Sequence, residues 1–256
     1  MPVSYDFSGQ VAVVTGAAGV LGGAVATRFV DAGASVVAVD VVDPVDAAVP
    51  DGATYRQADL TDEETVAALF EAVAETEGRI DALTNVAGTW RGGDPVDETA
   101  VETFDLLFDV NLRTAFLATK HALAHLRETE GAVVSVSARS GLSGGEGDAF
   151  YRASKAGVKI LTESVAEENL GTVRANCVLP SVIDTPMNRE MMSGADLSAW
   201  VDPADTADVM HFLCSDGAAP TSGAAVPVDG EARLACPGGG RHAVGRPLAG
   251  SPGRRR

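Results

Sequence analysis

Short apolar runs alternate with longer segments of helical periodicity along most of the chain. Short runs rich in β-branched residues are typical of buried strands in a parallel sheet. They occupy residues 10–15, 35–40, 54–57, 80–88, 131–137, 173–179 and 224–228. Helical spacing is found in residues 24–32, 61–77, 101–126, 150–170 and 202–214. This alternation predicts an α/β fold: one doubly wound parallel sheet of about seven strands with helices on both faces.

Single residues mark the starts of two predicted helices, and one residue is unusual for a helix interior. Thr61, followed three residues later by Glu64, predicts a capping box at the start of the second helix. Asp202 before Pro203 predicts the start of the last helix. Asn111 falls in the middle of the helical stretch 101–126, where asparagine is mildly unfavourable, so its presence there needs a reason.

Right-handed crossovers place the carboxyl ends of parallel strands along one edge of the sheet. The glycine-rich segment 16–22 follows the first predicted strand, and Asn85 lies near the end of the fourth. Ala138, Tyr151 and Pro180 lie in or just after the connections that leave the next strands. We therefore expect these residues to gather at one edge, where ligands of such sheets bind.

The composition limits the class of protein. The chain has 256 residues, of which 46% are hydrophobic, enough for one large core. No apolar run approaches the roughly 20 residues of a membrane span, and the first residues lack the layout of a signal peptide. Three cysteines without a CxxC pair favour a reducing, cytoplasmic setting. The four histidines have no second ligand at metal spacing, so no metal site is expected.

The charge is large and unevenly distributed. The net charge is −17, but residues 231–256 carry +5 and residues 1–230 carry −22. So acidic a body repels nucleic acid and anionic membranes, which makes a small molecule the expected partner. We expect residues 1–230 to form the folded domain and the Gly/Pro/Arg-rich tail 231–256 to be disordered.

The first predicted strand leads into a glycine turn and a helix. Glycines such as Gly16, Gly19 and Gly22 let the backbone approach a pyrophosphate, and a helix start offers free N–H groups. The next strand ends at Asp40, where a carboxylate suits the ribose hydroxyls of an adenosine and repels a 2′-phosphate. This succession is typical of a Rossmann-type dinucleotide site. It predicts NAD(H) as the preferred cofactor, with NADP(H) left open as the alternative.

Tyr151 and Lys155 are four residues apart and share one face of a predicted helix. A nearby ammonium favours the phenolate and lowers the phenol pKa from its usual value of about 10. The pair would then donate and accept protons in a pocket. Taken alone, however, the pattern is also compatible with an ordinary surface helix.

Over residues 7–230 the chain resembles the short-chain dehydrogenase/reductase family. Residues 15–22 are similar to its TGxxxGxG turn, residues 85–88 to NNAG, Tyr151 and Lys155 to the catalytic YxxxK, and 180–185 to PGxxxT. The resemblance implies a cofactor site built from Gly16, Ala18, Gly19, Val20, Leu21, Gly22, Asp40, Asp59, Leu60, Asn85, Ala87, Gly88, Tyr151, Lys155, Pro180, Ser181, Val182, Ile183 and Thr185.

The resemblance also implies roles at the reacting centre. Tyr151 would be the acid and base for a carbonyl or alcohol substrate, and Lys155 would hold the nicotinamide ribose. Asn111 matches the catalytic asparagine that orders a relay water behind Lys155. The helices 101–126 and 150–170 are similar to those that pair in family oligomers, so a homotetramer or homodimer is expected.

Three departures from the family pattern bear on the expected site. Val20 stands at the middle glycine of the turn, and Ser181 replaces the glycine of PGxxxT. Ala138 stands where the family has its catalytic serine, 13 residues before Tyr151, and Ser140 is the candidate replacement. The leading hypothesis is a reductase or dehydrogenase that supplies this hydrogen bond differently. The alternatives are a dinucleotide-binding protein with little catalysis, and a lyase or isomerase on the same fold.

Overall fold

A computed structural model describes residues 5–230, and the tail expected to be disordered, 231–256, lies outside the described residues. The seven strands pair in parallel in the order β3-β2-β1-β4-β5-β6-β7. They are β1 (Val11–Thr15), β2 (Ser35–Asp40), β3 (Ala53–Gln57), β4 (Ala82–Asn85), β5 (Ala132–Val136), β6 (Arg174–Pro180) and β7 (Ala225–Val228). The predicted doubly wound sheet is confirmed.

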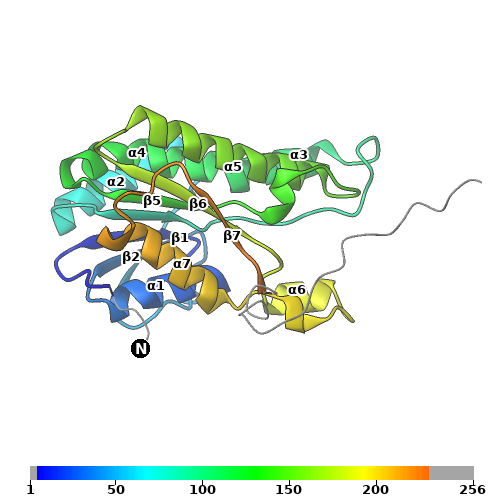
Figure 1. The fold of residues 1–256 in the computed structure, drawn as a ribbon, viewed down its shortest axis with the longest axis horizontal. Helices are drawn as coiled ribbons and strands as arrows, with labels where there is room; N and C mark the ends of the chain where they lie inside the picture. Colours follow the sequence, from blue (N-terminus) through cyan, green and yellow to red (C-terminus); the bar gives the residue numbers. More distant parts are fainter. Residues whose placement is uncertain (1–4, 231–256) are drawn as a thin grey trace, which may run out of the picture.

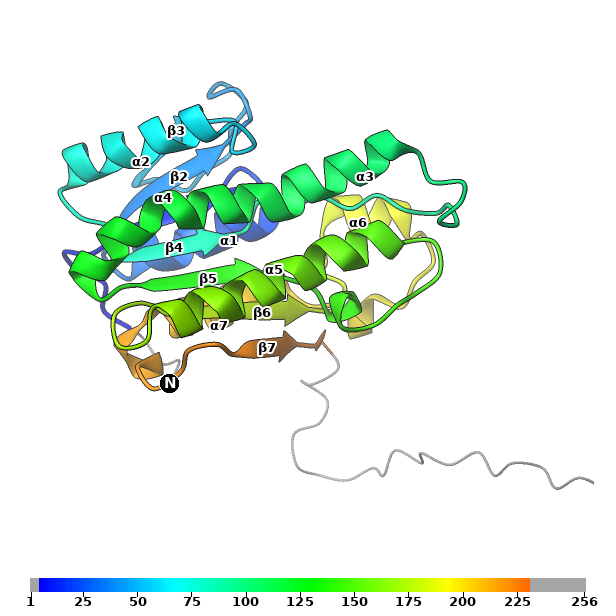
Figure 2. The same ribbon diagram turned by 90° about the horizontal axis from the view of Figure 1, so that it is seen from above.

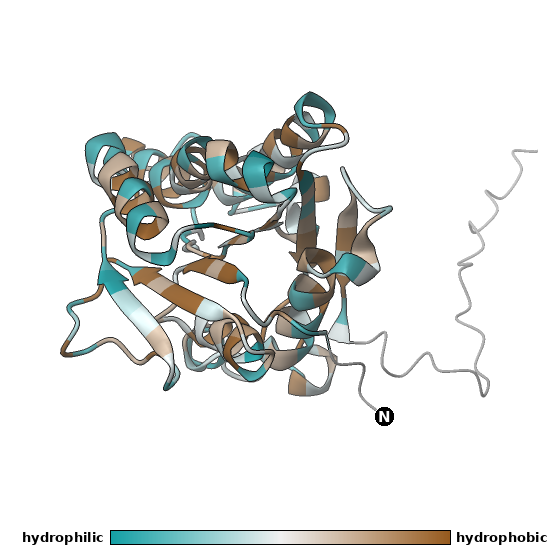
Figure 3. Cartoon of the chain, turned by 90° about the vertical axis from the view of Figure 1, so that its left-hand side faces the viewer, coloured by the Kyte–Doolittle hydropathy of each residue, from teal (hydrophilic) through white to brown (hydrophobic). Residues whose placement is uncertain are grey.

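Helices cover both faces of the sheet (Figure 1, Figure 3). They are α1 (Val20–Asp31), α2 (Glu63–Glu77), α3 (Val101–Phe108), α4 (Thr114–Thr129), α5 (Ala149–Glu168), α6 (Pro186–Met191) and α7 (Pro203–Cys214). Helices α2, α4 and α5 lie on one face, and α1 and α7 lie on the other. The short α6 lies beyond the carboxyl ends of the central strands (Figure 2).

The sheet separates two apolar cores. Phe7, Phe29 and Met210 pack between the sheet and the layer formed by α1 and α7. Phe70 and Leu126 belong to the core under α2, α4 and α5. The central strands β1, β4 and β5 are buried along their whole length, which explains why their sequences are continuous apolar runs.

Two helix starts differ from the predictions. The first helix begins at Val20, four residues earlier than expected, because Gly22 and Gly23 belong to it. A Cβ at Gly22 would stand 2.0 Å from the carbonyl oxygen of Gly16, so the helix needs this glycine to pack on the turn. The predicted Thr61 cap of α2 is wrong. Asp62 caps this helix by accepting the N–H of Thr65, while the Thr61 hydroxyl donates to another carboxylate.

The long helical stretch after residue 101 is not one regular helix. Residues Asp109–Arg113 form a π-helical turn between α3 and α4, and Asn111 lies inside it. Such a turn changes the direction in which one side chain points, and π turns often occur at functional sites. The π-helical turn therefore explains why an asparagine, which is unfavourable in the interior of a regular helix, is found at position 111.

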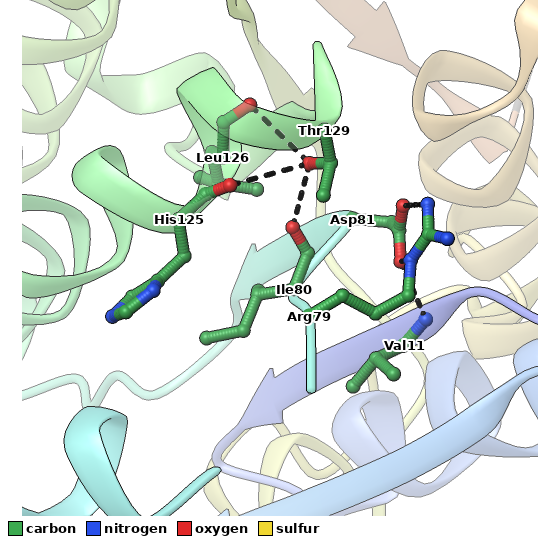
Figure 4. A network of polar contacts seen from close by, with 7 residues as sticks. All are labelled: Val11, Arg79, Ile80, Asp81, His125, Leu126 and Thr129. Atoms are coloured by element: carbon green, nitrogen blue, oxygen red, sulfur yellow. Dashed lines mark hydrogen bonds and ion pairs between the residues drawn. The ribbon is translucent and has the colours of Figure 1, made fainter. Parts of the chain in front are cut away.

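The amino ends of the strands are held by a polar network on the edge opposite to the glycine turn (Figure 4). Asp81 accepts the backbone N–H of Val11 at 2.8 Å and forms an ion pair with Arg79. The hydroxyl of Thr129 donates to the carbonyl of Ile80 at 2.7 Å. The network joins β1, the start of β4 and the end of α4, and it leaves the carboxyl edge for binding.

Within residues 5–230, none of the helices combines the length and apolar character needed to cross a bilayer.

Candidate active site

The glycine turn connects β1 to α1 at the carboxyl edge of the sheet. Gly16 has φ +65°, and a Cβ there would lie 2.7 Å from the backbone nitrogen of Ala87. The hydroxyl of Thr15 accepts the N–H groups of Val86 and Ala87. The turn is therefore packed directly against the segment after β4. Thr15 is part of the motif, but the sequence did not identify its role in joining these two segments.

The amino end of α1 is suited to a phosphate. Gly19 is its N-cap, and among the described residues no side chain caps this helix or places a carboxylate in its first turn. The first N–H groups, those of Val20 and Leu21, therefore remain available to an anion. The turn forms although Val20 replaces a glycine, because Val20 is the first helical residue and its side chain is 49% exposed.

Asp40, the last residue of β2, lies beside the glycine turn. One carboxylate oxygen accepts the N–H of Ala18 at 3.0 Å, and the other accepts the N–H groups of Val41 and Val42. Residues 41–52, which follow it, include three aspartates and no Lys or Arg. The carboxylate is thus held in place, and the loop 41–52 that follows it offers no cation to a 2′-phosphate.

Three residues of the expected cofactor site, Asp59, Leu60 and Asn85, differ in how far their side chains are buried and paired. Leu60 is buried, whereas Asp59 is exposed and one of its oxygens accepts both the N–H and the hydroxyl of Thr61. Asn85 donates to the hydroxyls of Thr119 and Ser135, and its buried carbonyl oxygen has no partner within the described part of the chain. Asn85 therefore joins β4 to β5 and α4 with one acceptor left unpaired.

Lys155 is buried, and only 4% of it is exposed. Its ammonium donates to the carbonyl of Val136 at 3.0 Å, and burial lowers its pKa to about 8. A Cβ at Gly88 would lie 3.0 Å from the Lys155 nitrogen and 3.1 Å from the amide oxygen of Asn111. The side chains of Lys155 and Asn111 therefore converge beside one glycine, where a Cβ would crowd both of them.

Asn111 uses its whole amide group. It accepts the N–H of Thr89 at 2.8 Å and donates to the Thr89 carbonyl and to the hydroxyl of Ser154. Ser154 in turn donates to the carbonyl of Tyr151. The π-helical turn is thus linked to the segment after β4 and to the first turns of α5. Ser154 was not identified from the sequence, because only its partners reveal this role.

Tyr151 lies in the first turn of α5 and is partly buried. Its pKa is raised to about 12, mainly by burial and also by Asp148, while Arg152 acts in the opposite direction. The expectation of a lowered pKa is therefore wrong for the protein without a cofactor, because desolvation disfavours the phenolate and Lys155 is not among the groups that offset it. The phenol is therefore neutral at pH 7 in this state.

The two serines nearest Ala138 differ in availability. Ala138 itself is buried, at the entrance to a short 3-10 turn formed by Arg139–Leu142. Ser137 is buried, and its hydroxyl donates to the carbonyl of Lys155 at 2.7 Å, so it cannot turn to a substrate. The partly buried Ser140 makes no side-chain hydrogen bond within residues 5–230. Of the two, Ser140 keeps its hydroxyl free for a substrate.

The segment Pro180–Thr185, which begins at the end of β6, lies at the same carboxyl edge of the sheet. Its backbone continues the sheet, because Ser181 donates to Val228 and Asp184 donates to Val201. Thr185 caps α6 by accepting the N–H of Asn188, which leaves its own hydroxyl proton to donate. The buried hydroxyl of Ser181 has no partner among the residues that the structure describes. These groups, with the rest of Pro180–Thr185, offer donors beside the expected nicotinamide position.

Comparison with family models gives a match over most of the described chain. A family model described as enoyl-(acyl carrier protein) reductase matches residues 16–230. The match begins at the glycine turn and ends at the last described residue. It therefore covers the whole sheet apart from β1.

Characterised relatives extend over nearly the whole domain. Meso-2,3-butanediol dehydrogenase of Serratia marcescens is 37% identical over 240 residues, covering 88% of this chain and 95% of that protein. Cis-4-hydroxycyclohexanecarboxylate dehydrogenase of Sinomonas cyclohexanicum is 35% identical over 240 residues, covering 88% and 96%. The ligand-free structure of Thermoplasma acidophilum aldohexose dehydrogenase superposes with a TM-score of 0.83 at 26% identity, covering 94% of this chain and 100% of that chain. The chain therefore belongs to the short-chain dehydrogenase/reductase family of NAD(P)-dependent oxidoreductases.

Proposed function

We propose that this protein interconverts a secondary alcohol and its carbonyl compound with NAD(H), using Tyr151 as the acid and base. The observation that carries the proposal is the convergence of Lys155 and Asn111 beside Gly88, on the helix and turn that also hold Tyr151. An inert dinucleotide-binding protein has no need to bury a lysine there, because burial disfavours its charge.

Each residue has a separate part in this reaction. The bound nicotinamide dinucleotide supplies the hydride for reduction and accepts it in oxidation. Tyr151 gives its proton to the oxygen that develops negative charge during reduction, and it takes the proton of the alcohol in oxidation. Lys155, mostly protonated at pH 7, holds the nicotinamide ribose. Asn111 orders the water through which the proton reaches solvent.

The raised pKa of Tyr151 suits one direction better. A phenol with a pKa of about 12 is fully protonated at neutral pH and is ready to donate. Oxidation needs the phenolate, so its rate should rise with pH through the alkaline range. We therefore propose that near neutrality the phenol is in the protonation state that reduction needs, and that alcohol oxidation becomes faster at alkaline pH.

The cofactor preference follows from the surroundings of Asp40. Its carboxylate is fixed by the N–H groups of Ala18 and Val41, at the place where a ribose would lie. A 2′-phosphate there would meet this carboxylate and the acidic loop 41–52, which contains no Lys or Arg to pair with it. NAD(H) should therefore bind more tightly than NADP(H).

The substrate side is apolar. Met187, Met191 and Met192, which lie on α6 and directly after it, are 62%, 45% and 37% exposed, and Trp90 is 38% exposed. Flexible methionines adapt to irregular apolar ligands. Two relatives act, by name, on butanediol and on a hydroxylated cyclohexane ring. We therefore propose a small aliphatic or cyclic secondary alcohol as the substrate class.

A homodimer or homotetramer is supported by an uncovered hollow on the face of α4 and α5. It has a volume of about 740 Å³. Its apolar lining includes Phe108, Leu112, Phe116, Leu117 and Leu161. Phe116 is 45% exposed, which is costly in water for a side chain of this size. A second copy of the chain would cover this surface.

Two measurements test the function. Titration with NADH and with NADPH, followed by fluorescence, should give tighter binding of NADH. A panel of secondary alcohols that includes 2,3-butanediol and 4-hydroxycyclohexanecarboxylate should then show NAD-dependent formation of NADH. Equal or tighter NADPH binding would overturn the cofactor assignment. Failure to bind either dinucleotide would overturn the proposed function itself.

A further inference from the structure

A loop of ten residues, 139–148, joins β5 to α5 and separates Ala138 from Tyr151. It begins with the 3-10 turn Arg139–Leu142 and ends at Asp148, the residue before α5. Most of its residues between these ends are exposed. The position of Ser140, which lies inside this loop, relative to the phenol of Tyr151 therefore depends on what holds the loop.

The side chain of Arg152 makes the holding contacts. Its Nε donates to the carboxylate of Asp148 at 2.5 Å. One terminal nitrogen donates to the carbonyls of Ser140 at 3.1 Å and Ser143 at 3.3 Å. One guanidinium thus binds both ends of the loop, with only 23% of the Arg152 side chain exposed. The fixed fork of an arginine can make such contacts at once, whereas a lysine is a single point charge.

The middle of the loop lies against the same guanidinium. A Cβ at Gly145 would stand 2.3 to 2.4 Å from three atoms of the Arg152 guanidinium, so only a glycine lets the backbone come this close. The neighbouring residue Gly147 accepts the N–H of Gly93 at 2.6 Å. The segment 91–93, which also borders the expected substrate space, therefore rests on the loop that Arg152 holds.

We propose that Arg152 is a positioning residue of the active site: its guanidinium fixes the loop 139–148 on the helix that carries Tyr151, and thereby fixes Ser140 relative to the phenol. The inference rests on the proposed function of Tyr151. It does not make Arg152 a catalytic residue, because the hydrogen bonds of its guanidinium described above go to loop oxygens.

The missing serine gives this contact its importance. A family serine at position 138 would sit on the rigid end of β5, whereas Ser140 lies two residues further, inside the loop. A hydroxyl on a loop orients a substrate only if the loop is held within about half an ångström of its working position. The positive charge of Arg152 also opposes the rise in the pKa of the adjacent Tyr151, so the same side chain acts on the phenol.

The kinetic test compares Arg152→Gln and Arg152→Lys with the wild type and with Arg28→Gln. Arg28 forms an Arg–Asp ion pair with Asp208 at 2.5 Å, between α1 and α7, and serves as the matched control. We expect kcat/KM for the alcohol to fall about 10- to 100-fold in Arg152→Gln, the loss typical of a displaced reacting group, with the NADH Kd unchanged. Arg28→Gln should keep the wild-type rate. A rate loss below twofold in Arg152→Gln would overturn the proposal.

Two further readouts separate positioning from a general loss of structure. If Arg152 acts through Ser140, Ser140→Ala should cost much less in the Arg152→Gln background than in the wild type. The alkaline rise in the oxidation rate should move to higher pH in Arg152→Gln and stay near the wild-type position in Arg152→Lys, which keeps the charge. Additive losses together with an unmoved pH profile would show a merely structural arginine.

Hydrogen exchange makes the test independent of turnover. Amides of residues 139–148 should exchange at least tenfold faster in Arg152→Gln than in the wild type, and Arg28→Gln should leave them unchanged. Hydrogen exchange can be measured even if the protein oxidises no alcohol. It therefore tests the role of Arg152 separately from the proposed dehydrogenase activity. Unchanged exchange of these amides in a folded Arg152→Gln protein would overturn the inference.

Discussion

Ala138 is the residue that decides how the substrate oxygen is held. Ser137 cannot replace the family serine, because its hydroxyl is buried against the carbonyl of Lys155. Ser140 makes no side-chain hydrogen bond within the described residues, so it remains available. Of the two serines, Ser140 is therefore the candidate for this task, two residues beyond the usual position.

Substitutions at these positions should have unequal effects on turnover. We expect Ala138→Ser to change kcat by less than about tenfold, because the substrate oxygen already has a partner. Ser140→Ala should lower kcat by about 10²-fold, the effect of removing one donor to a developing oxyanion. Steady-state kinetics at saturating NADH measure both. An increase of two orders of magnitude in Ala138→Ser would instead indicate an enzyme impaired by the missing serine.

The place of a single residue in the fold was predictable only where spacing determines it. Tyr151 and Lys155 lie on one helix and Asp40 ends a strand, as their sequence positions predicted. The pKa of Tyr151 was not predictable, because it depends on burial and on Asp148 and Arg152. Ser154 was missed for the same reason: its bond to Asn111 joins two segments that only the fold brings together.

At the scale of elements, the π-helical turn shows where periodicity fails. Residues 101–126 have helical spacing throughout, and the sequence predicts one continuous helix there. The extra residue of the π turn changes the hydrogen-bond pattern without changing the apolar pattern enough to be noticed. Asn111 gave the one signal, as an unfavourable residue in a helix interior. The cap of α2 was assigned to Thr61 because the pattern alone does not say whether Thr61 or Asp62 is the cap.

A substitution at the amino ends of the strands should lower the stability of the protein without changing its affinity for NADH. Asp81→Ala removes the acceptor of the buried Val11 N–H and the partner of Arg79. We expect the free energy of unfolding to fall by about 1–3 kcal/mol, the cost of an unpaired buried donor. Urea unfolding measures this loss. The NADH Kd should be unchanged, because these contacts lie at the amino ends of the strands, away from the glycine turn.

A control variant separates the buried contact from the ion pair. Arg79→Gln removes only a partly exposed ion pair and should cost less than about 1 kcal/mol. A loss in Arg79→Gln as large as that in Asp81→Ala would show that the ion pair, and not the backbone contact, stabilises this edge. A weakened NADH affinity in Asp81→Ala would contradict the division of roles between the two edges.

At the scale of the whole molecule, the sheet topology was accessible from the sequence. Continuous apolar runs for β1, β4 and β5 indicate burial on both faces, and right-handed crossovers then fix where their ends meet. The positions of the loops were not accessible, because their contacts are made by long side chains across several residues. Arg152 is the clearest case: nothing in its sequence neighbourhood indicates two carbonyl partners in the preceding loop.

The hollow on the face of α4 and α5 predicts the state of assembly. Light scattering at micromolar concentration should show a dimer or tetramer for the wild type. Phe116→Asp should shift it toward the monomer, because a charge would replace an apolar side chain in the covered surface. Val45→Asp, at an 85% exposed apolar residue in the loop after β2, is the control and should not change the mass. A monomeric wild type would contradict this assignment.

The most direct test of the account compares Tyr151→Phe with the wild type in turnover and in NADH binding. The substitution removes the phenolic oxygen and keeps a ring of nearly the same shape. The account predicts that turnover falls by at least 10³-fold while the NADH Kd changes less than threefold, and that the alkaline rise in oxidation rate disappears. Turnover in Tyr151→Phe within tenfold of the wild type would show that another group moves the proton and would contradict the central claim.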